Sequence, residues 1–461
     1  MTRPTTRLRL AALFAAGALA LSPIAASAHT INETLSDAYK NSGLLGKNRA
    51  VLRAADEGVA QAISTLRPVV NYSLSGSYTD GAAALNSGWS STYALTASLT
   101  LYDFGRNQLG VEVQKELVLA TRQSLVSAEQ QVLFSAARAF FDVLEASAFV
   151  GLRESNVRLI TQELRAAEDR FEVGEVTRTD VAIAESRLAS ARSGFAAARG
   201  DLAIAQAAFE EAVGIDAHAL TQPTSSPRIP DSVAAAKAIA RRTHPDILAS
   251  QRRITVNELN LERARRELYP TLRGSARQSF NLDTGGQGST TLSLDYSGTI
   301  SQGGRLDSLI RQAQANLDES RADLHLARLA IDEAVESAYA QLAVARASRA
   351  ASEEQIRAST VAFRGVREEA TLGARTTLDV LDAEQELLDA RATRLSAVTA
   401  EYNAIYGILA AIGRLTAKDL GLPVQLYDPA EYYNLVKDAP RTTLSEQGAA
   451  LQRVLESLGK K

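Results

Sequence analysis

Cysteine is absent from this chain of 461 residues. Its absence excludes disulfide bonds, thiolate metal sites and a lipid-modified cysteine at a processed N-terminus. Long apolar runs are also lacking, because no stretch after residue 28 approaches the ~20 apolar residues of a membrane-spanning helix. If the protein reaches a membrane, a lipid on its N-terminus does not take it there.

Residues that could form a catalytic or metal site are few and scattered. The four histidines lie in different predicted elements without ligand spacing, so solvated or packed side chains are expected for His29, His218, His244 and His325. The glycines around Gly286 lack the strand-to-helix context of a phosphate-binding loop. A formal net charge of −3 argues against nucleic acid as a partner. We therefore predict that the protein is not an enzyme and has no cofactor, metal or nucleic acid.

The first 28 residues have the pattern of a signal peptide. Three arginines within the first nine residues precede an apolar run, residues 10–21, that is too short to cross a bilayer. Ala26-Ser27-Ala28 is a small-residue cleavage site. The mature chain is expected to begin at His29 and, without those three arginines, to carry a net charge of −6 (−3 − 3 = −6). The protein is therefore predicted to be exported.

Proline is missing from two long segments, residues 69–222 and 271–422. Each segment contains 68 residues, from Arg106 or Arg305 to a glycine, that are mainly good helix formers such as Ala, Leu, Glu, Arg and Gln. A helix of this length extends roughly 100 Å at about 1.5 Å per residue. A shorter helix is predicted to run back after each glycine. The sequence therefore predicts two long helical hairpins.

The turns of the two hairpins are copies of one another. Residues 174–192 align without gaps on residues 373–391, and Gly, Thr, Asp-Val, Ala-Glu, Leu and Ala-Arg coincide. The same offset of 199 residues relates Gly105 to Gly304, which indicates an internal duplication. In each turn the glycine can adopt a positive φ and end a helix, and the Thr and Asp that follow can cap the next one.

Four segments change from a helical period to alternation of apolar and polar side chains. They are residues 70–79, 92–101, 272–281 and 291–300. A period of two predicts strands with one apolar and one polar face. Strands of about ten residues with this pattern are typical of transmembrane β-strands, apolar toward lipid and polar toward a lumen. The segment from Asp80 to Ser90, which contains the single tryptophan Trp89, is predicted to be a loop.

The layout predicts two repeats followed by a tail. Each repeat begins with one helix, over residues 29–66 or 233–268, continues with two strands and ends with a long hairpin. In the helix over residues 29–66, Gly43 and Gly46 are expected to break the first turns. The linker between the repeats, residues 218–230, is rich in proline. An amphipathic helix is predicted in the tail from Ser445 to Leu458. The predicted parts are the signal peptide (1–28), the first repeat (29–222), the second repeat (223–414) and the C-terminal tail (415–461).

Four strands cannot close a barrel, which needs at least about eight. An open sheet edge in lipid leaves backbone groups unpaired, at several kcal/mol each. If these are membrane strands, several copies must share one barrel, and the pattern leaves two, three or four copies open. Ala-rich helix faces, such as residues 136–139 and 343–347, permit knobs-into-holes packing between neighbouring helices. A hollow helical tube that extends from a membrane barrel accounts for both features.

Three motifs lie at the ends of the predicted long helices, over residues 101–106, 170–181 and 373–384. With these motifs and the duplicated layout, the chain resembles the TolC family of outer-membrane efflux and secretion channels over almost all of its mature length. The absence of cysteine places it with the non-lipidated members. The resemblance implies a mostly α fold with a transmembrane β-barrel, in which a homotrimer forms a 12-stranded barrel in outer-membrane lipid and a twelve-helix periplasmic tunnel. It also implies docking to a periplasmic adaptor (membrane fusion) protein and to an inner-membrane transporter of the ABC or RND type.

The resemblance further implies a gate at the two hairpin turns, which form the periplasmic tip of the tunnel in this family. By motif position, Arg375 would pair with Thr179 and Asp180 to hold the tip closed. Asp379 and Asp382 share a helix face because they are three residues apart, and in a trimer they would form two acidic rings that favour cations. The alternative is that Asp180 and Asp379 only begin helices, where a carboxylate is stabilised by the helix dipole.

The same motifs imply a docking surface for the adaptor at the turns, where the alternative is an ordinary helix stop. The implied docking residues are Val173, Gly174, Glu175, Leu372, Gly373 and Ala374. One departure from the family concerns the gate: Ala370 stands where a tyrosine is common, so part of the clamp is expected to be missing or supplied elsewhere.

We therefore expect an exit duct in the outer membrane, with a long periplasmic extension, that passively conducts substrates from an inner-membrane transporter to the outside. Such a duct serves a tripartite efflux pump or a type I secretion system. The alternative is a soluble periplasmic coiled-coil adaptor or scaffold, which explains the helices but leaves the alternating strands without a role. The sequence does not identify the exported substrate, drug or protein, or the class of transporter.

Overall fold

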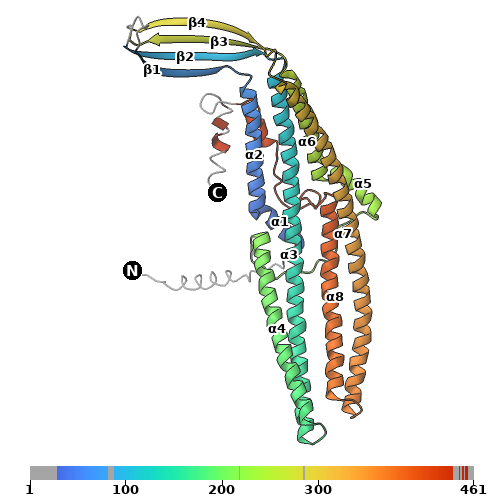
Figure 1. The fold of residues 1–461 in the computed structure, drawn as a ribbon. Helices are drawn as coiled ribbons and strands as arrows, with labels where there is room; N and C mark the ends of the chain where they lie inside the picture. Colours follow the sequence, from blue (N-terminus) through green and yellow to red (C-terminus); the bar gives the residue numbers. More distant parts are fainter. Residues whose placement is uncertain are drawn as a thin grey trace, which may run out of the picture. The chain divides into compact units, whose positions relative to one another are not determined.

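The structure of the chain is a computed structural model that describes residues 29–80, 88–217, 219–283 and 286–439 and, beyond these, residues 446, 449, 450 and 452–454. The predicted signal peptide and most of the helix predicted in the tail lie outside the described residues. Within the described part, each half consists of short helices, two strands and a long helical hairpin, in the order predicted from the repeat (Figure 1).

Four long helices form two hairpins (Figure 1). The outgoing helices have 67 residues each, and the return helices have 36 and 35: α3 (Arg106–Glu172), α7 (Arg305–Thr371), α4 (Arg178–Val213) and α8 (Thr377–Ala411). The prediction from the proline-free segments is therefore confirmed, because a run of good helix formers continues until a glycine ends it. Within the described part of the chain, no helix is both long enough and apolar enough to cross a membrane.

Short helices precede each pair of strands. They are α1 (Ile31–Asn41), α2 (Gly43–Ser64), α5 (Val233–Thr243) and α6 (Pro245–Arg266). The single helix predicted over residues 29–66 is divided at Ser42, whose hydroxyl accepts a hydrogen bond from the N–H of Leu45 at 3.2 Å. Ser42 is thus the N-cap of α2, a position for which serine is well suited.

The prediction of a single helix over residues 233–268 is wrong, because the helix is divided before Pro245. Proline lacks a backbone N–H and clashes with the preceding turn of a helix, so α5 ends at Thr243. Pro245 is instead the first residue of α6, a position that tolerates proline. His244 caps this helix, because its Nδ1 accepts from the N–H of Asp246 at 3.2 Å.

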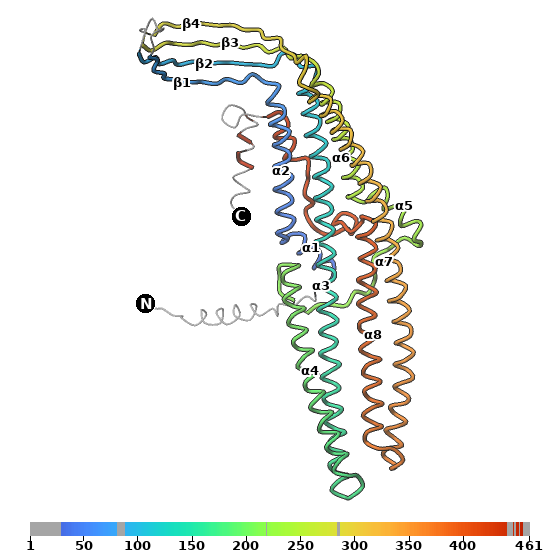
Figure 2. Tube along the Cα trace, in the orientation of Figure 1, coloured from blue at the N-terminus to red at the C-terminus, as the bar shows by residue number. Residues whose placement is uncertain are grey.

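The strands form one antiparallel sheet in the order β1–β2–β3–β4 (Figure 2). Their bounds are β1 (Val69–Thr79), β2 (Gly88–Tyr102), β3 (Thr271–Asn281) and β4 (Gln287–Ser297). The register sets apolar side chains opposite one another, as in the pairs Tyr72↔Leu95, Tyr93↔Phe280 and Leu272↔Tyr296. The predicted strands with two unlike faces are confirmed, and β1 and β4 are the edges of the sheet within the chain.

Three strand boundaries differ from the prediction by three residues or more, and one of them is the end of β4, at Ser297 rather than at residue 300. Trp89 was predicted in a loop, but it lies in β2 opposite Tyr78, with the two rings 5.6 Å apart. Likewise β4 begins at Gln287, opposite Asn281, rather than at residue 291. Both starts are rich in Gly and Ser, a composition typical of loops, and backbone pairing with the preceding strand extends the ladder through them.

The duplication can be followed through the helices and strands of both repeats. The offset is 202 residues before the strands, from Gly43 of α2 to Pro245 of α6, and 199 residues after them, from Arg106 of α3 to Arg305 of α7. The change of three residues falls in the strand connections, which span residues 80–87 in the first half and 282–286 in the second. The second half therefore has the shorter hairpin connection.

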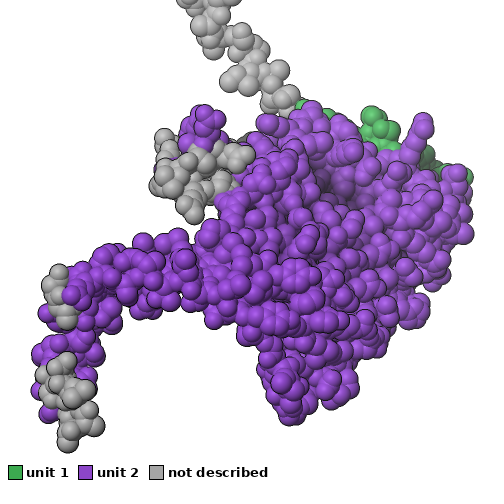
Figure 3. All heavy atoms as spheres, turned by 90° about the horizontal axis from the view of Figure 1, so that it is seen from above, with its two compact units in different colours: residues 1–37, 136–226, 355–395 green, residues 38–135, 227–354, 396–461 purple. Residues whose placement is uncertain are grey.

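The chain divides into two compact units (Figure 3), and each takes segments from both halves. Unit 1 comprises residues 1–37, 136–226 and 355–395, and it contains both hairpin turns. Unit 2 comprises residues 38–135, 227–354 and 396–461, and it contains the sheet.

The tail of unit 2 adds one short helix that the sequence did not predict, α9 (Glu431–Val436). Tyr432 and Val436 are buried against Ala60 of α2. The Tyr432 hydroxyl donates to Glu57 Oε1 at 2.7 Å, which fixes α9 to α2.

Candidate functional site at the hairpin turns

The first hairpin turn is built by a glycine stop and a capping box. Gly174 has a φ of 80°, in the left-handed region, and Glu175 N–H donates to the carbonyl of Arg170 at 2.9 Å. This pattern closes the last turn of α3. Thr177 then caps α4: its hydroxyl accepts from the N–H of Asp180 at 3.3 Å, while Asp180 Oδ2 accepts from the N–H of Thr177 at 2.9 Å.

The second turn repeats this geometry. Gly373 has a φ of 77°, and Ala374 N–H donates to the carbonyl of Glu369 at 2.9 Å. Asp379 Oδ2 accepts from the N–H and the hydroxyl of Thr376 at 2.9 and 2.8 Å, and these bonds lower the pKa of Asp379. Within the chain, Asp180 and Asp379 thus begin helices, as the alternative interpretation of these residues anticipated.

Arg375 lies inside the second turn and is bonded to it. Its Nε donates to Glu369 Oε2 at 2.9 Å, and this bond raises the guanidinium pKa, with a smaller contribution from the charge of Asp379. Among the described residues of one chain, Arg375 is therefore bonded to Glu369 and not to Thr179 or Asp180. The gate pairing of Arg375 with Thr179 and Asp180 stays a prediction for the assembled protein.

Asp382 connects the two hairpins of one chain. Its Oδ1 accepts from Arg187 Nη2 of α4 at 2.8 Å, and the two side chains are 58% and 42% exposed. An ion pair this exposed contributes about 0–1 kcal/mol to stability. It orients the carboxylate of Asp382, which stays exposed to solvent. The pairing with Arg187 was not predicted, because the repeat places no charge partner near this position.

The predicted docking residues lie at the surface of the turns. Val173 is 70% exposed and Leu372 is 84% exposed, which is unusual for large apolar side chains. The other four, Gly174, Glu175, Gly373 and Ala374, are exposed as well. Each hairpin turn thus has one large, solvent-exposed apolar side chain next to its glycine.

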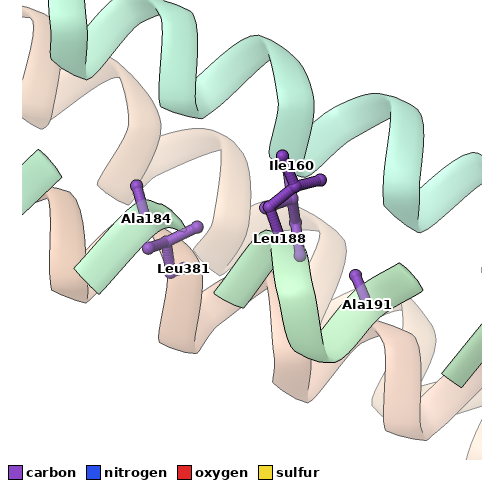
Figure 4. Close-up of a cluster of buried hydrophobic side chains, with 5 residues drawn as sticks. All are labelled: Ile160, Ala184, Leu188, Ala191 and Leu381. Atoms are coloured by element: carbon purple, nitrogen blue, oxygen red, sulfur yellow. The ribbon is translucent and has the colours of Figure 1, made fainter. Parts of the chain in front are cut away.

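Apolar side chains behind the turns hold the hairpins together. One cluster joins α3, α4 and α8 (Figure 4) and consists of Ile160, Ala184, Leu188, Ala191 and Leu381. A second cluster joins α7 and α8, with a contact from Leu159 of α3, and consists of Phe363, Ala370, Val380 and Leu387. Small alanines lie among the larger apolar side chains of both clusters, which permits close packing of the helices.

Ala370, the departure from the family pattern, is only 5% exposed and belongs to the second cluster. Beside it lies a cavity of about 130 Å³ that Arg367, Thr371 and Thr377 also line. The small side chain at this position leaves that space open. The hydroxyl of Thr377 is buried there without a hydrogen-bond partner in the described structure.

A buried carboxyl group near the turns was not predicted. Glu384 is 5% exposed, and its Oε1 accepts from Asn156 Nδ2 of α3 at 2.7 Å, while Oε2 has no partner among the described residues. Burial raises its pKa to about 7, the Asn156 bond opposes the rise, and nearby Glu163 adds to it. Glu185, the matching residue of the first copy, is exposed, so the two copies differ at this position.

Glu384 borders a pocket of about 350 Å³ between α3, α7 and α8. Arg364, Arg367 and Arg391 also line it, and of these only the charge of Arg367 lowers the pKa of Glu384. In the part of the chain that the structure describes, no three His, Asp or Glu side chains are grouped so that they could hold a metal ion.

Comparisons with known proteins agree with this architecture. The chain matches the family described as "Outer membrane efflux protein" over residues 34–215 and 238–414. It is 35% identical over 425 residues to outer membrane efflux protein BepC of Brucella suis, covering 90% of this chain and 92% of that protein. It is 24% identical over 417 residues to outer membrane protein TolC of Escherichia coli, covering 84% of each. Among solved structures, the CmeC outer membrane channel of Campylobacter jejuni has the same fold, with a TM-score of 0.76 at 17% identity and 90% coverage of both chains.

Proposed function

The chain belongs to the outer membrane efflux protein family, and we propose that it serves as the outer-membrane exit duct of a tripartite efflux pump or a type I secretion system. The duct conducts passively, and the energy for export comes from an inner-membrane transporter of the ABC or RND type. The family membership supports the location in the outer membrane.

One observation carries the proposal: the sheet is open at both edges and exposes a continuous apolar face. Large apolar side chains form a contiguous exposed patch on this face, which is rare in a soluble monomer, and they include Tyr72 (79%), Leu74 (69%), Leu292 (79%) and Leu294 (67%). Contact with lipid accounts for that exposure. The edge strands β1 and β4 each have 11 residues, and in lipid their unpaired backbone groups need partners.

A homotrimer supplies those partners. In an antiparallel sheet of four strands, β1 and β4 run in opposite directions, so β4 of one copy can continue the ladder with β1 of the next. Three copies give a closed barrel of 12 strands (3 × 4), above the minimum of about eight. The four long helices of each copy likewise give a tunnel of twelve helices (3 × 4).

The hairpin turns provide the gate and the docking surface in this proposal. Arg375, held by Glu369 within its own turn, pairs with Thr179 and Asp180 of an adjacent hairpin when the duct is closed. Asp379 and Asp382 face the lumen as two acidic rings that favour cations. The bare side chains Val173 and Leu372, with the four docking residues beside them, contact a periplasmic adaptor protein.

A soluble periplasmic scaffold, the alternative considered from the sequence, does not account for the exposed apolar face of the sheet. Incorporation of the purified mature protein into planar lipid bilayers distinguishes the two. The duct is expected to give stepwise single-channel currents and to sediment with outer membranes. Recovery in the soluble periplasmic fraction, or bilayers that stay silent at all protein concentrations, would favour the scaffold.

A further inference from the structure

All charged side chains of the described strands lie on one face of the sheet. β1 and β2 have no charged residues, β3 has Arg273 and Arg277, and β4 has Asp295. Residues 273 and 277 point to the same side because they are four apart in a strand. Asp295 is directly opposite Arg273 in the β3–β4 register, so it points to that side as well.

This charged face is the polar face of the sheet. The transverse row through Arg277 is neutral apart from the arginine itself, and in order from β1 to β4 it consists of Asn71, Thr96, Arg277 and Thr291. In the row through Arg273, this arginine lies between Thr100 of β2 and Asp295 of β4. The opposite face holds the exposed apolar side chains that contact lipid in the proposed duct.

Arg277 lies near the middle of β3, where the bilayer midplane falls for a strand that crosses it. An arginine is least tolerated on the lipid side at this depth, and is tolerated on the side of an aqueous lumen. Arg277 is exposed, and no hydrogen bond or ion pair joins its guanidinium group to another described residue of the chain. Its charge is therefore available to solutes in the lumen.

The two arginines differ in whether an acidic residue lies opposite to balance their charge. Asp295 is opposite Arg273 and balances its charge, whereas no acidic residue shares the row of Arg277. Each copy thus adds a net charge of +1 to the polar face, from two arginines and one aspartate (2 − 1). The acidic residues Asp379 and Asp382 belong to the other compact unit, so the two charged regions can be altered independently.

We propose that Arg277 forms a cationic ring inside the barrel and makes the outer segment of the duct selective for negatively charged cargo. This inference rests on the proposed function, because it assumes a closed barrel with the polar face inside. Arg277 is the specificity-determining residue, and Arg273 with Asp295 is a neutral pair beside it. Cargo with carboxylate or phosphate groups is the class that such a ring favours.

The expected size of the effect follows from Coulomb's law. One charge acting across ~10 Å of water changes the local concentration of a monovalent ion about two-fold, upward for one sign and downward for the other. Salt screens the effect over a Debye length of about 10 Å at 0.1 M. The contribution of Arg277 is therefore measurable at or below this ionic strength.

The test measures reversal potentials of single channels of the full-length protein in planar bilayers under a KCl gradient at low ionic strength. Arg277→Gln is expected to raise the permeability ratio of K⁺ to Cl⁻ at least about two-fold, because it removes one charge per copy. Arg277→Lys keeps the charge and is expected to leave the ratio unchanged. The double variant Arg273→Gln/Asp295→Asn leaves the net charge unaltered and is expected to behave like the wild type.

A second variant, Arg277→Cys, tests the lumen position in assembled channels, because the chain has no other cysteine. A cationic thiol reagent is expected to restore the wild-type ratio, and an anionic reagent to raise the ratio further. Channels whose ratio does not change in Arg277→Gln, or a thiol in Arg277→Cys that no water-soluble reagent reaches, would overturn the inference while leaving the duct intact. A wild-type protein that forms no channels would overturn the proposed function, and the inference with it.

Discussion

Replacement of Glu384 by glutamine is expected to remove a pH dependence from the stability of unit 1. The carboxyl group is 5% exposed, and one of its oxygens has no partner among the described residues. Glutamine has nearly the same shape, and its Oε1 can keep the 2.7 Å hydrogen bond from Asn156. The variant therefore changes the charge of this site and little else.

The sign follows from proton linkage. Folding raises the pKa of Glu384 from 4.5 to about 7, so between these values the folded state holds a proton that the opened state has lost. The contribution of Glu384 to stability is then fully present below about pH 4.5 and is lost as the pH rises through 7. A shift of this size corresponds to about 3 kcal/mol at pH 8, at about 1.4 kcal/mol per tenfold change in proton affinity. The charge of Arg367 lowers the pKa of Glu384, and the charge of Glu163 raises it.

Hydrogen exchange of the α8 amides around residue 384 measures the effect, after correction for the intrinsic pH dependence of exchange. The wild-type opening free energy is expected to fall by up to about 3 kcal/mol between pH 5 and 8, and Glu384→Gln is expected to flatten this profile. Glu185→Gln is the matched control, because Glu185 holds the same repeat position on the surface. Equal slopes in the wild type and Glu384→Gln would refute the assignment of the buried proton.

Three further predictions concern the hairpin turns. Arg375→Ser is expected to raise single-channel conductance because it removes the cation of the proposed gate, and unchanged currents would contradict that role. Gly373→Ala is expected to destabilise its turn by about 1 kcal/mol, because φ is 77° there. Gly365 lies in open space within α7, so Gly365→Ala is expected to stabilise its helix by about 0.5–1 kcal/mol. Amide hydrogen exchange measures both effects. Leu372→Ser combined with Val173→Ser is expected to reduce cross-linking to an adaptor without changing conductance, and full cross-linking would argue against docking at the turns.

Features with a local cause could be predicted from the sequence. The glycines at 174 and 373 end helices because they tolerate positive φ, and both have it. Threonine and aspartate cap the helices that follow, as their side-chain oxygens allow. The two-faced strands also follow from a local pattern, because a period of two fixes which side chains share a face.

Features that depend on partners distant in sequence were missed. The burial of Glu384 involves Asn156 in another helix, a contact that no local pattern indicates, and its repeat mate Glu185 is exposed. Trp89 joined a strand because Tyr78 lies opposite to it in the ladder, which no single segment reveals. The break at Pro245 had a local cause, and the helical pattern on both sides of it concealed the signal.

The central claim, that each copy contributes four strands to one closed barrel, can be tested directly because the chain has no cysteine. Within one chain β1 and β4 are separated by three strand spacings of about 4.8 Å, or about 14 Å, too far for a disulfide. Ser73→Cys on β1 is combined in turn with Ser289→Cys, Thr291→Cys or Ser293→Cys on β4, and outer membranes are oxidised.

Any disulfide between these positions must join different copies. The account predicts that at least one pair gives a ladder of covalent species that ends at the trimer on denaturing gels. A ladder that continues beyond three copies, or monomer alone for every pair, would contradict it.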